Sequence, residues 1–159
     1  MNARILFLCI ISFFISCTES DDFDFLKNPD CKHYIFLGHI YHSPNRIDPG
    51  VEKLHLSIYN QIWLGGDLCS ETTREYSTIL YLNRIFNLAS DFTHWTLGNH
   101  DIRNGNHEWI TTATGKDFYY AQSFQSFTLF NLNTSLINMN RFDLINNQYE
   151  LLKNVCDTI

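Results

Sequence analysis

The chain has 159 residues, of which 45% are hydrophobic and 15% aromatic, and its formal net charge at pH 7 is −6. Typical domains contain about 100–150 residues, so this length and hydrophobicity predict one domain with one compact core. The 11 Lys and Arg residues do not supply the basic surface that binding to a nucleic-acid backbone requires. This composition argues against a nucleic-acid-binding protein.

The first residues have the composition of an export signal. Arg4 supplies a positive charge, and Ile5 to Ile15 form an apolar segment, shorter than the roughly 20 residues that a membrane-spanning helix needs. The Ser16-Cys17 pair and the polar residues after it resemble a bacterial lipoprotein signal, which implies lipidation of Cys17. A secretory peptide cleaved without lipidation is the alternative. Both interpretations predict export, and the lipoprotein interpretation predicts a protein anchored to a membrane of the bacterial cell envelope.

Residues 18–30 are polar and acidic, which predicts a disordered tether between signal and domain. The domain is predicted over residues 31–159. It contains three cysteines, Cys31, Cys69 and Cys156, and no C-x-x-C pair, so no zinc-ribbon or thioredoxin-type motif is present. One disulfide between two of the three fits an oxidising compartment, but the sequence does not select the pair.

Short apolar segments alternate with longer amphipathic ones in the domain, a pattern typical of a layered α/β sheet with flanking helices. Three strands are predicted, over residues 33–37, 61–64 and 93–97, and each ends at a glycine. A helix over 75–88 connects the second and third strands. Two further strands, over 118–121 and 127–132, and a helix over 146–156 complete the prediction.

Polar side chains follow the glycines at the ends of the first three strands: His39, Asp67 and Asn99. Ligands of open α/β sheets bind at the carboxyl ends of the strands, so we expect these side chains to converge. A carboxylate such as Asp67 can bridge two cations, and Asn99 can add an amide oxygen. His100 can then donate a proton to a leaving group or hold a phosphoryl oxygen. Taken singly, each glycine motif could equally be a polar turn.

Together, Leu64-Gly65-Gly66-Asp67 and Leu97-Gly98-Asn99-His100-Asp101 resemble the G-D and G-N-H-[D/E] motifs of calcineurin-like metallophosphoesterases. The resemblance implies the calcineurin-like fold and hydrolysis of a phosphoester substrate. It also implies two divalent metal ions, of iron, zinc, manganese or magnesium. By position, Asp67 is similar to the bridging ligand, Asn99 to a ligand of the second metal and His100 to the catalytic histidine. Asp101 is expected to orient its loop.

The first motif of that family, D-x-H, is altered here, because His39 occupies the position of the aspartate and Tyr41 that of the histidine. Imidazole still ligates zinc or iron, so His39 remains a candidate ligand, with less negative charge to hold the ion. His42 and Asp48 are further candidates that could compensate.

Two other departures concern the phosphate contacts and the C-terminus. Ser70 and Glu71 replace an aspartate and an arginine of the protein-phosphatase branch, and Arg103 and Asn104 are the candidate phosphate contacts. No histidine follows His107, whereas the family closes its site with later histidines. The resemblance therefore implies a C-terminally incomplete domain. The alternative to a hydrolase is a degenerate, non-catalytic lipoprotein that binds a ligand or a partner.

Overall fold

The computed structural model describes residues 32–124, 127–137 and 142–156. The predicted export signal, the lipidation site Cys17 and the tether lie outside these residues, as does Cys31. Of the other two cysteines, Cys69 is buried and Cys156 exposed, and both are free thiols. Within the described residues, no helix combines the length and the apolar character needed to cross a bilayer.

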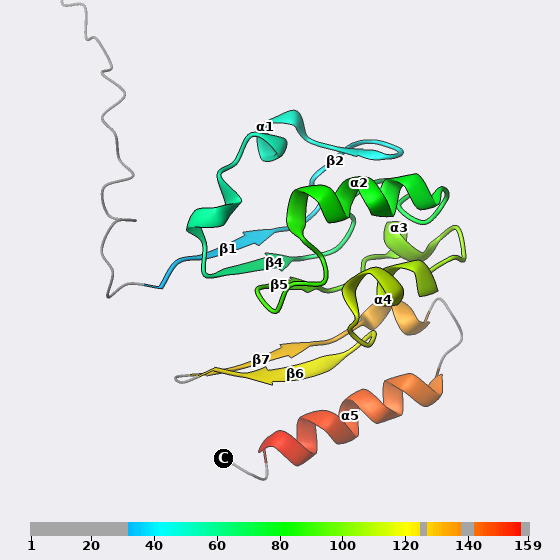
Figure 1. The fold of residues 1–159 in the computed structure, drawn as a ribbon. Helices are drawn as coiled ribbons and strands as arrows, with labels where there is room; N and C mark the ends of the chain where they lie inside the picture. The colour runs from blue at the N-terminus through cyan, green and yellow to red at the C-terminus, as the bar shows by residue number, and fades with distance from the viewer. Residues whose placement is uncertain (1–31, 125–126, 138–141, 157–159) are drawn as a thin grey trace, which may run out of the picture. The chain divides into compact units, whose positions relative to one another are not determined.

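The central element is a parallel sheet of three strands, in the order β1 (Tyr34–Leu37), β4 (Gln61–Leu64) and β5 (Thr93–Trp95) (Figure 1). Leu37 pairs with Leu64, and Leu64 pairs with Trp95. The carboxyl ends of the three strands therefore lie at the same edge. All three strands were predicted from their apolar segments and terminal glycines, and the structure confirms them.

Helices cover one face of this sheet. The predicted connecting helix is present as α2 (Tyr76–Phe86), which ends where Asn87 adopts a left-handed conformation. It packs against α4 (Glu108–Thr114), and two shorter helices, α1 (Pro49–Glu52) and α3 (Asn99–Ile102), flank the strand ends (Figure 1). Leu64 from β4 and Ile79, Leu82 and Phe86 from α2 are fully or almost fully buried in this core.

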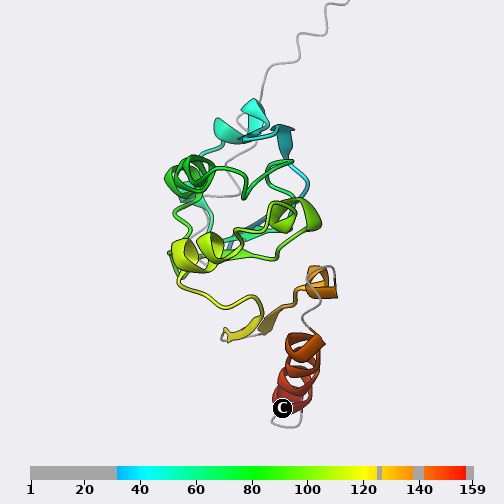
Figure 2. The same cartoon turned by 90° about the vertical axis from the view of Figure 1, so that its right-hand side faces the viewer.

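Two hairpins flank the parallel sheet. The first pairs β2 (Tyr41–Ser43) with β3 (Arg46–Ile47), and the second pairs β6 (Tyr120–Ser123) with β7 (Thr128–Asn131) (Figure 2). The second hairpin corresponds to the two later predicted strands. Short 3-10 turns, η2 (Leu56–Ile58) and η3 (Thr134–Ile137), complete the connections.

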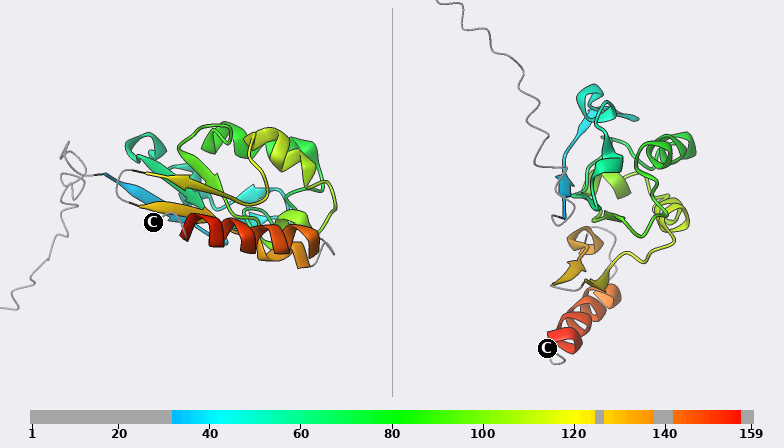
Figure 3. Two further views of the ribbon diagram at one scale, coloured as in Figure 1. Left: turned by 90° about the horizontal axis from the view of Figure 1, so that it is seen from below. Right: turned by 60° about the vertical axis from the view of Figure 1, so that its left-hand side comes forward.

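The predicted C-terminal helix is α5 (Phe142–Cys156), which lies against β6 and η3 (Figure 3). One buried side chain makes this contact specific. Gln148 Oε1 accepts the N–H of Asn133 at 2.6 Å, and Gln148 Nε2 donates to the carbonyl of the same residue at 3.2 Å. The reciprocal pair fixes α5 to the chain that leaves β7.

A polar network joins the second hairpin to the other face of the sheet. His94 Nε2 lies 2.8 Å from Gln61 Oε1, and His94 Nδ1 lies 3.0 Å from the hydroxyl of Tyr120. Asn131 Nδ2 donates to the same hydroxyl at 3.1 Å. Burial, with the positive charge of Lys116 as a second cause, lowers the pKa of His94 to about 4. The neutral imidazole fits this network, because it donates through one nitrogen and accepts through the other.

Candidate functional site

The candidate site lies at the carboxyl ends of the three parallel strands. Gly38 ends β1 and places His39 there, while Gly66 precedes Asp67 after β4. Both polar residues have left-handed backbone conformations, with φ of 57° at His39 and 53° at Asp67. Such conformations are uncommon outside glycine and are enriched at functional sites. The N–H of His39 donates to the carbonyl of Gly66 at 3.0 Å, which ties the two strand ends together.

The three predicted residues His39, Asp67 and His100 form one cluster. His39 Nδ1 lies 3.3 Å from Asp67 Oδ2, and the backbone N–H of His100 donates to Asp67 Oδ1 at 2.9 Å. The side chain of His39 is 65% exposed and that of Asp67 12% exposed. One carboxylate oxygen is thus engaged by the protein backbone, and the other faces an accessible imidazole.

The imidazole of His100 is oriented by two neighbours. Its Nδ1 lies 2.9 Å from the carbonyl oxygen of Ser70, which can only accept, so Nδ1 carries a proton. The ring of Tyr41 stacks on His100 with a centroid distance of 5.5 Å and an interplanar angle of 20°. Arg103 Nη1 also donates to Ser70, at 3.4 Å. The guanidinium of this candidate phosphate contact therefore lies near His100.

A buried carboxylate, that of Asp101, supports the whole arrangement. Asp101 has no exposed surface, and its oxygens accept hydrogen bonds from five donors. These donors are the backbone N–H groups of Asp67 (2.8 Å), Leu68 (3.2 Å) and Gly98 (2.9 Å), the hydroxyl of Thr72 (2.7 Å) and Nε1 of Trp95 (3.3 Å). Burial raises the pKa of Asp101, and these hydrogen bonds offset part of the rise. Asp101 orients its loop, as predicted.

Two glycines allow the strand ends to approach closely. A Cβ at Gly98 would lie 2.1 Å from Asp67 Oδ1, and a Cβ at Gly66 would lie 2.7 Å from the backbone nitrogen of Gly98. Gly66 also has a φ of 86°, which favours glycine. The G-D and G-N-H motifs thus have a direct steric role, because the Asp67 carboxylate occupies space that any other side chain at position 98 would fill.

The remaining predicted residues lie at different distances from this cluster. Asn99 is the exposed first residue of α3, next to His100, and Asn104 is exposed just beyond Arg103. His42 follows Tyr41 in β2, where the pairing with β3 is irregular. Asp48 has another role, because its Oδ1 accepts the N–H of Gly50 at 2.7 Å and caps α1. Neither His42 nor Asp48 joins His39.

The contribution of Tyr41 was not predicted from the sequence. Its ring lies 4.9 Å from that of His39 as well as stacking on His100, so it lines the site between the two imidazoles. The replacement of a family histidine by Tyr41 was the available signal. The sequence does not show that Tyr41, in β2, stacks on His100; that contact is seen only in the structure.

The donor atoms present fit one divalent ion in part. Zinc holds nitrogen and oxygen ligands at about 2.0–2.2 Å, and tetrahedral geometry then separates neighbouring donors by roughly 3.3–3.5 Å. The 3.3 Å between His39 Nδ1 and Asp67 Oδ2 matches that separation. In the described part of the chain, however, no group of three or more His, Cys, Asp or Glu residues is placed to hold a metal ion.

Comparison of the chain with protein-family models, curated proteins and solved structures found no match. Over the residues that it describes, the structure is a mixed α/β fold with one small parallel sheet and two antiparallel hairpins.

Proposed function

We propose that the chain is a metal-dependent phosphoester hydrolase of the calcineurin-like kind. The observation that carries the proposal is the convergence of three strand ends, where His39 Nδ1 lies 3.3 Å from Asp67 Oδ2 and the N–H of His100 binds the same carboxylate. These residues follow the glycines of the motifs that resemble that family. A structural turn would require neither an exposed imidazole beside the carboxylate nor two left-handed residues facing each other.

In this proposal two divalent ions, of iron, zinc, manganese or magnesium, would be held by Asp67 together with His39 and Asn99. An ion held there supplies Lewis acidity toward a phosphoryl oxygen. The backbone N–H of His100 occupies Asp67 Oδ1, so Oδ2, 3.3 Å from His39 Nδ1, would be the oxygen available to a metal ion.

His100 is the proposed catalytic residue. Its Nδ1 donates to the carbonyl of Ser70, which leaves Nε2 to face the substrate. In the imidazolium form, with a proton on both nitrogens, Nε2 can donate to the leaving oxygen or hold a phosphoryl oxygen. Tyr41 keeps the ring in this orientation by stacking. Arg103, whose guanidinium lies beside the same carbonyl, and the neighbouring Asn104 are proposed to contact phosphate oxygens.

The proposed location is the bacterial cell envelope, with the domain anchored to a membrane through a lipid on Cys17. This part of the proposal rests on the apolar segment and the Ser16-Cys17 pair alone. Metabolic labelling with a radioactive fatty acid tests it. Label that persists in a Cys17→Ser variant would contradict it.

A second candidate function is binding without turnover. It is favoured by the small donor set, since among the described residues no three His, Cys, Asp or Glu side chains gather around one point. Such a protein would hold at most one ion at His39 and Asp67. It would recognise a ligand or a partner through the same strand ends.

Metal binding tests the shared basis of both candidates. Titration with Zn²⁺ or Mn²⁺ is expected to raise the melting temperature of the purified chain, because binding to the folded state alone stabilises it. Asp67→Asn should abolish the shift. Asp117→Asn, which changes an exposed carboxylate outside the site, should retain it. An equal shift in all three proteins would contradict the assignment of Asp67.

A further inference from the structure

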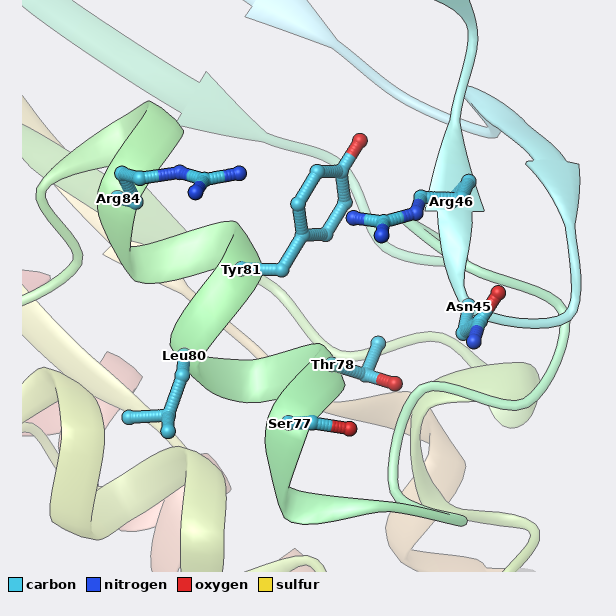
Figure 4. Close-up of a pocket in the computed structure, with 7 residues that line it drawn as sticks. All are labelled: Asn45, Arg46, Ser77, Thr78, Leu80, Tyr81 and Arg84. Atoms are coloured by element: carbon cyan, nitrogen blue, oxygen red, sulfur yellow. The ribbon is translucent and has the colours of Figure 1, made fainter.

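A second polar pocket of about 290 Å³ lies between the β2–β3 turn and one face of α2 (Figure 4). Asn45 and Arg46 line it from the turn, while Ser77, Thr78, Tyr81 and Arg84 line it from the helix. It shares no residue with the candidate metal site. None of its lining residues is acidic.

Two guanidinium groups dominate the charge of this pocket. The Arg46 guanidinium carbon lies 4.2 Å from the centroid of the Tyr81 ring, and that of Arg84 lies 5.9 Å from it. Figure 4 shows the two guanidinium groups extending toward this ring from opposite sides. Neither arginine forms an ion pair with a described residue, whereas Arg74 pairs with Glu71 at 2.5 Å. In a chain with a net charge of −6, two arginines without a carboxylate partner thus converge on one pocket.

A buried hydroxyl in the same pocket lacks a partner. Thr78 is only 2% exposed, and its Oγ1 forms no hydrogen bond within the described residues. Figure 4 shows this side chain projecting from α2 toward the turn that carries Asn45. A buried polar atom without a partner costs about 1–3 kcal/mol, so such atoms usually mark a missing water, ion or ligand.

The first turn of α2 lines one end of the pocket. Ser77 and Thr78 lie in the first turn of α2, where backbone N–H groups carry partial positive charge. The N-cap residue, Glu75, makes no side-chain hydrogen bond to these groups. Its carboxylate instead accepts a bond from the Ser77 hydroxyl at 3.4 Å. The hydroxyl of Tyr81 is likewise committed, to Glu52.

We propose that this pocket binds a phosphate-type oxyanion, held by Arg46 and Arg84 and by the hydroxyl of Thr78. Guanidinium groups suit such oxygens because their N–H donors form a planar fork. The two guanidinium groups lie on opposite sides of the Tyr81 ring, so an anion with two phosphoryl groups matches them better than an anion with one. The pocket residues are separate from the residues of the proposed hydrolase. Anion binding at this pocket can therefore be tested independently of the hydrolase activity.

Isothermal titration of the full chain with inorganic pyrophosphate and with inorganic phosphate, in the presence of a metal chelator, tests this site. We expect saturable binding of pyrophosphate, tighter than that of phosphate. Arg46→Met and Arg84→Met should each weaken it about tenfold, as expected for loss of one charge-assisted contact. Thr78→Val, which keeps the shape of the side chain, should weaken it about threefold.

Two matched variants show whether the arginines of this pocket bind the anion. Arg46→Lys retains the charge and should lose less affinity than Arg46→Met, and urea unfolding of each variant identifies any loss of folding. Arg74→Met removes an exposed arginine outside the pocket, paired with Glu71, and should leave the affinity unchanged. Absence of saturable binding to the wild-type chain would overturn the proposal. Binding that survives in the double Arg46→Met, Arg84→Met variant, or that disappears in Arg74→Met, would also overturn it.

Discussion

The carboxylate of Asp101 accepts a hydrogen bond from the backbone N–H of Asp67 at 2.8 Å. Asp101 is fully buried, and this bond fixes the backbone of Asp67, whose own carboxylate is the candidate metal ligand. The Asp101 carboxylate also holds Gly98, which lies against the Asp67 side chain. Two aspartates thus have separate tasks. Asp67 presents an oxygen to the site, and Asp101 keeps the strand ends at the spacing that this requires.

Asp101→Asn should destabilise the fold by about 2–4 kcal/mol, because the amide nitrogen of asparagine would face donors that lose their acceptor. The change keeps the size of the side chain, so the loss reports hydrogen bonding and not packing. Urea unfolding measures it. Asp117→Asn is the control, because Asp117 is exposed, and its stability should stay within about 0.5 kcal/mol of wild type. Equal stabilities for the two variants would contradict the role given to Asp101.

Gly98→Ala should displace the Asp67 carboxylate, since the new Cβ would meet Asp67 Oδ1 at 2.1 Å. Overpacking of this kind costs about 1–3 kcal/mol, and we also expect the metal-dependent rise in melting temperature to disappear. Gly115→Ala is the matched control. Gly115 has a φ of 65° with open space around it, so alanine there should cost only about 1 kcal/mol and leave metal binding intact. Retention of the metal effect in Gly98→Ala would argue against the close approach.

The stability of the fold should depend on His94 in mildly acidic solution. Burial lowers the pKa of His94 to about 4, below the value of about 6.5 expected in the unfolded chain. The unfolded chain therefore takes up a proton first as the pH falls, and the stability present above about pH 6.5 is lost toward pH 4. We expect protonation of His94 to lower the free energy of unfolding by about 2 kcal/mol over this pH range.

Urea unfolding at about pH 7 and about pH 4.5 measures how much the free energy of unfolding falls over this interval. His94→Gln should lose less stability over this interval than the wild-type chain, because it no longer titrates. The exposed His55 provides the comparison, and His55→Gln should behave as wild type. If His94→Gln and wild type lose the same amount, the buried neutral imidazole is not the cause.

Much of the sheet could be predicted because its signal is local. The apolar segments before Gly38, Gly65 and Gly98 correspond to β1, β4 and β5, and the helical spacing after Glu75 corresponds to α2. The β2–β3 hairpin and the short helices α3 and α4 were not predicted. They contain few apolar positions, and their conformation depends on contacts with distant residues, such as the bond from the N–H of Glu71 to the carbonyl of Pro44 at 2.9 Å.

The candidate site likewise contains features that the sequence predicts and features that it does not. The strand ends predicted the convergence of His39, Asp67 and Asn99, because carboxyl ends of parallel strands share one edge. In the structure the contacts join His39, Asp67 and His100, while Asn99 is exposed. The stacking of Tyr41 and the carbonyl of Ser70 could not be predicted, since each depends on how a loop folds back over the strand ends. Asp48 shows the opposite case. Its position before Pro49 suited a helix cap as well as a metal ligand, and in the structure it caps α1.

If the proposed hydrolase is correct, Tyr41 acts as a positioning residue for His100. Tyr41→Leu should lower kcat about threefold to tenfold, the effect expected for the loss of an aromatic stack, and should affect KM less. Tyr41→Phe retains the ring and should retain kcat. Equal rates for Tyr41→Leu and Tyr41→Phe would show that the stack does not position the catalytic ring.

The most direct test of the central claim is hydrolysis of an aryl phosphate monoester and an aryl phosphate diester by the purified chain, with and without added Mn²⁺ or Zn²⁺. The hydrolase predicts turnover of at least one ester that requires the metal and falls at least about a hundredfold in His100→Ala, as expected for loss of a general acid. Asp67→Asn should be equally inactive. Metal-dependent stabilisation without turnover would contradict the hydrolase and favour the binding protein.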